Sequence, residues 1–106
     1  MYEDIAPREY LDRQKDNPEW QLLDVREDWE RDIVKVEGCL HIPMAHIPER
    51  LSELDAATPI AVICHSGGRS ARVAGFLVEQ GFGTVANIAG GVDAWSTDID
   101  SSLARY

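Results

Sequence analysis

The fold of this chain is decided by one stretch of its sequence, Ile60-Ala61-Val62-Ile63-Cys64-His65-Ser66-Gly67-Gly68-Arg69-Ser70. The first five of these residues form a continuous apolar run bounded by turn signals, which is typical of a strand covered on both faces. Two glycines follow, and apolar residues then recur at helical spacing over residues 69–80. A buried strand that turns through glycines into an amphipathic helix predicts an α/β protein.

The rest of the chain continues this alternation. We expect further strands at residues 21–25, 39–42 and 84–88, with Ile5 closing a very short first strand. We expect helices at residues 7–16, 47–54 and 92–96, and a charged turn or short helix at residues 26–31. Three tryptophans are expected in the core: Trp20, Trp29 and Trp95. This order predicts a mainly parallel sheet with helices on both faces, in which ligands bind beyond the carboxyl ends of the strands.

Composition and charge limit the classes of protein to which this chain can belong. The chain has 106 residues, and we expect residues 1–106 to form a single domain. Its net charge of −9 argues against nucleic acid or an anionic membrane as a partner. The N-terminal residues MYEDIAPREY include no apolar segment of the kind found in a secretory signal. Because two cysteines are too few for a disulfide scaffold, we expect a cytoplasmic protein.

The segment after the central strand carries the candidate chemistry. Gly67 and Gly68 allow backbone N–H groups to converge at a helix N-terminus, which makes an anion site. A cysteine at that point, Cys64, should have a lowered pKa and react as the thiolate. Arg69 lies in the first helical turn, where a cation opposes the helix dipole, and its fork suits an oxyanion such as sulfonate or phosphate. Arg72 follows one turn later, and its role is left open.

The other cysteine and the histidines are interpreted more plainly. Cys39 has no glycine turn after it, so we expect a small core residue. We expect His41 to be structural and His46 to lie at the surface. A zinc site built from Cys39, His41, Cys64 and His65 lacks the paired ligand spacing, so we predict neither a metal nor a cofactor.

Four motifs in order give the chain a resemblance to the rhodanese family of sulfurtransferases: Leu23-Asp24-Val25-Arg26-Glu27, Gly38-Cys39-Leu40-His41-Ile42-Pro43, Cys64-His65-Ser66-Gly67-Gly68-Arg69-Ser70 and Gly90-Gly91-Val92-Asp93-Ala94-Trp95. The chain is most similar to the small single-domain bacterial type. One departure is Val34-Lys35-Val36, where many members carry Gly-His-Ile. The resemblance implies a three-layer α/β fold with a mainly parallel sheet of about five strands and helices on both faces.

The resemblance also implies an activity. Cys64 would take the sulfane sulfur of thiosulfate or of a persulfide donor and pass it to cyanide or a thiol. The donor would be bound by the loop residues His65, Ser66, Gly67, Gly68, Arg69 and Ser70, with Arg69 on a sulfonate group. Asp24 and Arg26 would brace the structure. The implied partners are a small-molecule sulfur donor and a thiol acceptor, with a sulfur-carrier protein or a cysteine desulfurase as candidates.

Two other classes of function stay open. A phosphatase or arsenate reductase needs five residues between cysteine and arginine, and here that arginine position is Ser70, with Arg69 one residue early. A non-catalytic interaction module usually lacks the cysteine, and Cys64 is present. The sequence therefore favours sulfur transfer over both alternatives.

Overall fold

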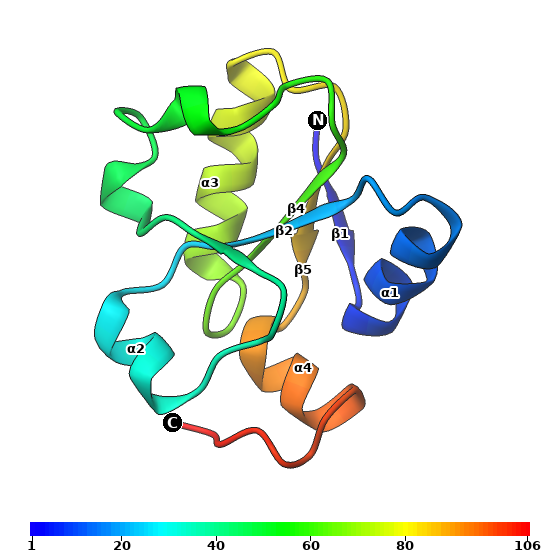
Figure 1. The fold of residues 1–106 in the computed structure, drawn as a ribbon, viewed down its shortest axis with the longest axis vertical. Coiled ribbons are helices and arrows are strands. Elements are labelled where there is room, and N and C mark those ends of the chain that lie inside the picture. Colours follow the sequence, from blue (N-terminus) through cyan, green and yellow to red (C-terminus); the bar gives the residue numbers. More distant parts are fainter.

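The computed structural model describes residues 1–106 and contains a five-stranded parallel sheet (Figure 1). The strands are β1 (Glu3–Ile5), β2 (Gln21–Asp24), β3 (Leu40–His41), β4 (Ile60–Ile63) and β5 (Val85–Ile88). The helices are α1 (Pro7–Asp16), α2 (Asp28–Ile33), α3 (Gly68–Glu79) and α4 (Gly91–Asp98), with short 3-10 helices η1 (Met44–His46) and η2 (Leu51–Glu53). The α/β fold with a parallel sheet of five strands is thus confirmed.

Alternate residues of the central strand β4 supply the two halves of the core. Ile60 and Val62 pack on one face with residues of α3, whereas Ala61 and Ile63 pack on the other face with residues of α1 and α4. All four residues are at most 2% exposed. The continuous apolar run therefore reflects a strand that is covered by helices on both sides.

The strand order β1-β5-β4-β2-β3 places a crossover switch between β2 and β4. From β2 the chain proceeds to β3 on one side, and from β4 it proceeds to β5 on the other side. Asp24 at the end of β2 pairs with Ile63 at the end of β4, so the two following loops start side by side. Ligands bind at such a switch in open α/β sheets, so the geometry points to the residues after Asp24 and Ile63.

The prediction of a helix at residues 47–54 is wrong. This segment contains a turn and the 3-10 helix η2, although Ile47 and Leu54 are both buried as their spacing suggests. The N–H groups of Glu53 and Leu54 donate three residues back, to the carbonyls of Arg50 and Leu51 at 3.0 Å each, so the segment closes 3-10 turns in place of an α-helical ladder. The apolar spacing correctly identified the inward-facing residues but not the backbone conformation.

Trp29 is not a core residue, in contrast to the expectation from sequence. Trp20 and Trp95 are 8% and 6% exposed, whereas Trp29 is 60% exposed. Trp29 belongs to α2, a helix of six residues whose buried residue is Glu30. The helix turns a carboxylate inward and leaves its tryptophan at the surface, edge-on to Tyr106 with ring centroids 6.2 Å apart.

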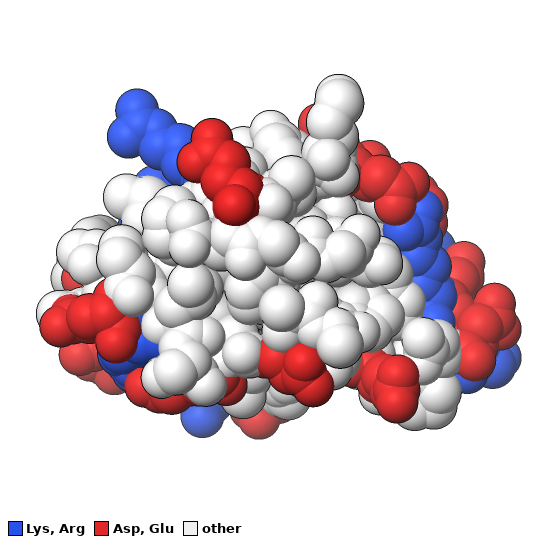
Figure 2. All heavy atoms as spheres, turned by 90° about the horizontal axis from the view of Figure 1, so that it is seen from above, with Lys and Arg blue, Asp and Glu red and all other residues white.

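Charge is distributed unevenly over the surface. Figure 2 shows the molecule from above, toward the amino ends of the strands, where uncharged residues dominate and acidic residues gather at the margin. The candidate cysteine lies at the opposite, carboxyl end of the sheet.

No helix combines the length and apolar character needed to cross a membrane.

Candidate active site

Cys64 lies at the carboxyl end of β4 and is followed by a tight loop that enters α3. Cys64 is 1% exposed. The loop after it curls back, so that the Gly67 N–H donates to Cys64 Sγ at 3.1 Å. Gly67 has a φ of 111°, a conformation that L side chains rarely adopt, and this requires the glycine. The sequence therefore folds locally into a cradle of N–H groups around one sulfur atom.

Hydrogen bonds in this cradle favour the thiolate. Burial raises the pKa of the Cys64 thiol, but the Ser70 hydroxyl and the N–H groups of Ser70, Gly67 and Ser66 outweigh burial and lower the pKa below its ordinary value. The lowered pKa predicted from the glycine turn agrees with these contacts. The thiolate is the nucleophilic form of cysteine, so these hydrogen bonds favour reaction at Cys64.

The Ser70 hydroxyl has three acceptors for its single proton. Its Oγ lies 3.3 Å from Cys64 Sγ, 3.2 Å from the Gly67 carbonyl and 2.5 Å from Asn87 Oδ1. Asn87 is oriented by its own amide, which donates to Asp4 Oδ1 at 3.0 Å. Because an anionic sulfur is the strongest acceptor of the three, ionisation of Cys64 should draw the proton toward Sγ.

Helix α4 packs against the outer side of the same loop. The N–H groups of Val92 and Asp93 donate to the carbonyls of Cys64 and His65 at 2.8 and 3.1 Å. A Cβ at Gly91 would lie 2.4 Å from the Cys64 carbonyl oxygen, so only glycine permits this approach. His65 also faces Asp93, with 3.1 Å between Nε2 and Oδ1. These contacts fix the loop backbone from behind.

Arg69 points to Glu30 on the neighbouring helix α2. Its two terminal nitrogens form a bidentate pair with the Glu30 carboxylate at 2.5 and 2.7 Å. Glu30 is 2% exposed, and its pKa is lowered to about 2, chiefly by the hydrogen bonds from Arg69. The charge of Arg69 is therefore balanced within the protein, and the prediction that Arg69 binds a sulfonate stays a prediction.

Asp24 and Arg26 form a fully buried ion pair beneath the loop after β2. Arg26 donates to Asp24 Oδ2 at 2.8 Å and also to the Val34 carbonyl at 2.8 Å. The Arg26 carbonyl in turn meets His41 Nε2 at 2.7 Å. This arrangement suits the bracing role implied for both residues, because a buried pair with satisfied hydrogen bonds holds its loop in place.

Tyr106 joins the site from the far end of the sequence. Its ring stacks on His65 with centroids 3.9 Å apart and an interplanar angle of 12°. Its hydroxyl donates to Glu30 Oε2 at 2.7 Å and accepts from Arg26 at 3.0 Å. Sequence reasoning missed both residues because Glu30 meets Arg69 across 39 positions of the chain and Tyr106 meets His65 across 41.

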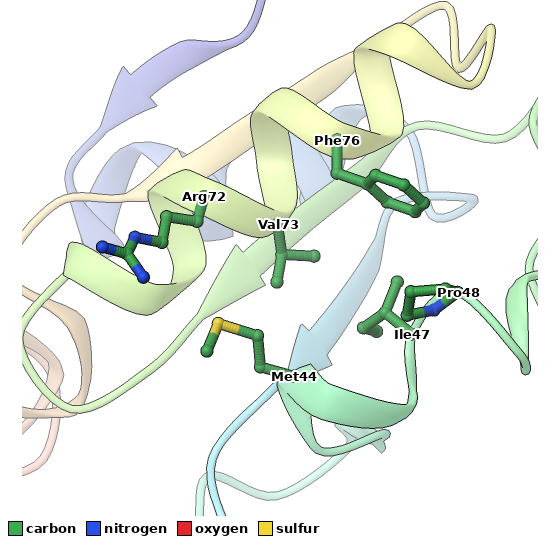
Figure 3. Close-up of a pocket in the computed structure, with 6 residues that line it drawn as sticks. All are labelled: Met44, Ile47, Pro48, Arg72, Val73 and Phe76. Carbon is green, nitrogen blue, oxygen red and sulfur yellow. The ribbon is translucent and has the colours of Figure 1, made fainter.

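A small apolar groove of about 120 Å³ lies beside α3, one turn beyond the loop (Figure 3). It is bounded by Met44, Ile47, Pro48, Arg72, Val73 and Phe76. In Figure 3 the Arg72 side chain extends along α3, toward the end of the helix at which the Cys64 loop lies. Arg72 therefore stands at the rim of this groove, and Val73 connects the groove to the core cluster that contains Cys64.

The fold and the site together define a class of protein. A buried cysteine ends the central strand of a parallel sheet, and loop N–H groups that precede a helix surround its sulfur. Residues 7–98 match the family described as Rhodanese-like domain. The chain belongs to the rhodanese family.

Related proteins agree with this assignment. The chain is 32% identical over 96 residues to "Sulfurtransferase" of Allochromatium vinosum, covering 91% of this chain and 90% of the relative. It is 46% identical over 77 residues to "Putative sulfurtransferase YtwF" of Bacillus subtilis, covering 73% and 74% of the two chains. The crystal structure of a rhodanese-like domain protein from Staphylococcus aureus superimposes with a TM-score of 0.82 at 28% identity, covering 98% of each chain. These similarities support sulfur transfer as the general activity.

Some relatives are longer than this chain. The chain spans 31% of "Rhodanese-like/PpiC domain-containing protein 12, chloroplastic" of Arabidopsis thaliana, at 39% identity over 92 residues. It spans 40% of "Putative sulfur carrier protein YrkF" of Bacillus subtilis, at 39% identity over 75 residues.

Proposed function

We propose that the chain is a sulfurtransferase that carries sulfane sulfur as a persulfide on Cys64. The proposal rests on the hydrogen bonds to the sulfur atom of Cys64. This atom accepts from the Gly67 N–H at 3.1 Å and lies 3.3 Å from the Ser70 hydroxyl oxygen. Donors placed in this way stabilise negative charge on the Cys64 thiolate that attacks the donor and that is restored when the sulfur leaves. We propose that residues 1–106 act as one rhodanese domain.

The reaction proceeds in two displacements. In the first, the Cys64 thiolate attacks the sulfane sulfur of thiosulfate or of a persulfide donor. A new S–S bond forms, the donor S–S bond breaks, and sulfite or a thiolate leaves with the electron pair. In the second, a thiolate or cyanide attacks the outer sulfur, the Cys64 S–S bond breaks, and the Cys64 thiolate is restored. The loop from His65 to Ser70 binds the donor while these bonds change.

The acceptor of the sulfur is proposed to be a thiol. The name of the relative YrkF supports a sulfur-carrier protein as one candidate, and a cysteine desulfurase is a candidate donor. Neither a metal nor a cofactor enters either displacement, because thiolate and persulfide chemistry needs only nucleophile and leaving group.

The intact mass of the protein after incubation with thiosulfate tests the proposal. The wild-type protein should gain one sulfur atom and lose it again on addition of cyanide. Cys64→Ala should gain none, and Cys39→Ala is the matched control and should behave as wild type. A persulfide on Cys64→Ala but not on Cys39→Ala contradicts the site assignment. No sulfur gained from thiosulfate or from an organic persulfide contradicts the proposed function.

A further inference from the structure

Glu30 is a buried carboxylate next to the candidate active site, and the proposed displacement steps do not use it. It is 2% exposed on α2, where the N–H of Glu27 donates to its Oε1 at 3.0 Å. Its Oε2 accepts from the Tyr106 hydroxyl at 2.7 Å. Both oxygens also accept from Arg69, so the carboxylate is held from three directions. Such a group is fixed before any substrate arrives.

The pair changes what Arg69 offers to a ligand. Arg69 is the cation of the loop itself, and its side chain is still 32% exposed. Because both terminal nitrogens already bind Glu30, an incoming anion would meet a neutral pair instead of a free positive charge. Turning Arg69 toward a ligand would also leave the Glu30 charge buried without its partner, which is strongly unfavourable.

We infer that Glu30 sets the donor preference of the Cys64 site by neutralising Arg69, so that the site favours persulfide donors without a sulfonate over thiosulfate. The inference rests on the proposed function. Thiosulfate is a dianion whose sulfonate end needs positive charge, whereas an organic persulfide presents its sulfur without that group. Glu30 acts through Arg69 and is a positioning residue.

The first test uses the wild-type protein with two donors, thiosulfate and an alkyl persulfide that carries no sulfonate. For each donor, kcat/KM is divided by the rate at which free cysteine accepts sulfur from the same donor. The normalised value should be at least about tenfold higher for the persulfide. Equal values, or a higher value for thiosulfate, overturn the inference while leaving sulfur transfer through Cys64 in place.

The second test removes the charge of Glu30. Glu30→Gln keeps the shape and an acceptor for the Glu27 N–H, and it frees the charge of Arg69. The KM for thiosulfate should fall about tenfold, and the KM for the alkyl persulfide should stay within about twofold. Asp32→Asn is the matched control, since it removes one negative charge from an exposed position on the same helix and should change neither value.

A double variant separates the proposed effect from a purely structural one. If Glu30 acts through Arg69, then Glu30→Gln combined with Arg69→Gln should lose the gain in thiosulfate use shown by Glu30→Gln alone. An equal change with both donors in Glu30→Gln means that Glu30 only braces the loop, and this overturns the inference. If Glu30→Gln does not fold, the normalised kcat/KM values of the wild-type protein for the two donors test the inference on their own. Absence of transfer from either donor by the wild-type protein would instead count against the proposed function.

Discussion

At the scale of single residues, the thiolate of Cys64 depends on contacts within its own loop. The sequence suggested that a helix N-terminus and converging loop N–H groups together lower the pKa of the thiol. The structure attributes the lowering to the Ser70 hydroxyl and to three backbone N–H groups, acting against burial. Arg69 forms a bidentate pair with Glu30, and the hydrogen-bond donors to the sulfur are Ser70 and the loop N–H groups.

Removal of the Ser70 hydroxyl should therefore raise the pKa of Cys64. A hydrogen bond to a charged group contributes about 1.5–3 kcal/mol, so Ser70→Ala should slow alkylation of Cys64 at neutral pH by roughly tenfold or more. The measurement is the rate of alkylation as a function of pH. Ser66→Ala is the control, because Ser66 contributes its backbone N–H and should keep the wild-type profile. A shift of equal size in both variants argues against a specific Ser70 hydrogen bond.

Glu30 should make a measurable contribution to the stability of the fold in a defined pH range. Its pKa is lowered from 4.5 to about 2, chiefly by Arg69, so the unfolded chain binds the proton more readily than the folded one. The stabilisation is fully present above about pH 5 and is lost as the pH falls from 4.5 toward 2. A shift of this size corresponds to roughly 3 kcal/mol.

Denaturant unfolding of the wild-type protein and of Glu30→Gln measures this contribution. The difference in free energy of unfolding should be constant at neutral pH and should shrink as the pH is lowered to 3. Asp32→Asn should show no such trend, because Asp32 is exposed. A difference that is the same at pH 7 and pH 3 contradicts the ion-pair account.

At the scale of elements, local patterns predicted most of the fold. Helix α1 was predicted with the bounds that the structure shows, since Pro7 suits a first turn and Asn17-Pro18 ends the helix. The predicted ends of strand β4 and helix α3 differ by at most one residue from the ends in the structure. Local apolar spacing did not predict the backbone at residues 47–54, where turn and 3-10 hydrogen bonds replace the α-helical ladder.

The glycine turn was also readable from sequence, but the contacts of the site were not. A strand, two glycines and a helix lie within twenty residues, so their arrangement follows from local rules. The pairing of Glu30 with Arg69 joins elements 39 residues apart and depends on the crossover between β2 and β4. No periodicity in the sequence indicates which carboxylate will meet which guanidinium.

The contact of α4 with the Cys64 loop gives a prediction at this scale. Gly91 has a φ of 58°, and a Cβ there would lie 2.4 Å from the Cys64 carbonyl oxygen and 2.5 Å from that of His65. Gly91→Ala should destabilise the fold by roughly 2–4 kcal/mol, from overpacking and the left-handed backbone. It should also slow persulfide formation, because the helix must move away from the loop.

Thermal unfolding and the rate of persulfide formation check this prediction together. Gly83→Ala is the matched control, since a Cβ at Gly83 would meet nothing within 4 Å. It should unfold and react close to wild type. A stable and fully active Gly91→Ala would mean that the close approach of α4 does not position the loop.

At the scale of the whole molecule, the two ends of the described chain serve the site differently. Strand β1 completes the sheet beside β5, and its Asp4 orients Asn87 behind Ser70. The segment after α4 returns across the carboxyl end of the sheet until Tyr106 stacks on His65 (Figure 1). The polar composition of residues 97–106 gave no sign of this return.

Tyr106 contacts His65, Glu30 and Arg26, and its removal should loosen the segments that carry these three residues. Tyr106→Ala removes the stack on His65 and the hydroxyl between Glu30 and Arg26. We expect a loss of roughly 1–3 kcal/mol in the free energy of unfolding, with faster hydrogen exchange at the amides of the Cys64 loop and of α2. Tyr106→Phe keeps the ring, so it should retain the protection of the loop and lose only part of the stability. Arg105→Ala, which alters an exposed contact to Thr97, is the control and should leave exchange in both segments unchanged. If Tyr106→Ala leaves exchange in the loop unchanged, the aromatic stack does not order the loop, and His65 must be held by its contact with Asp93 alone.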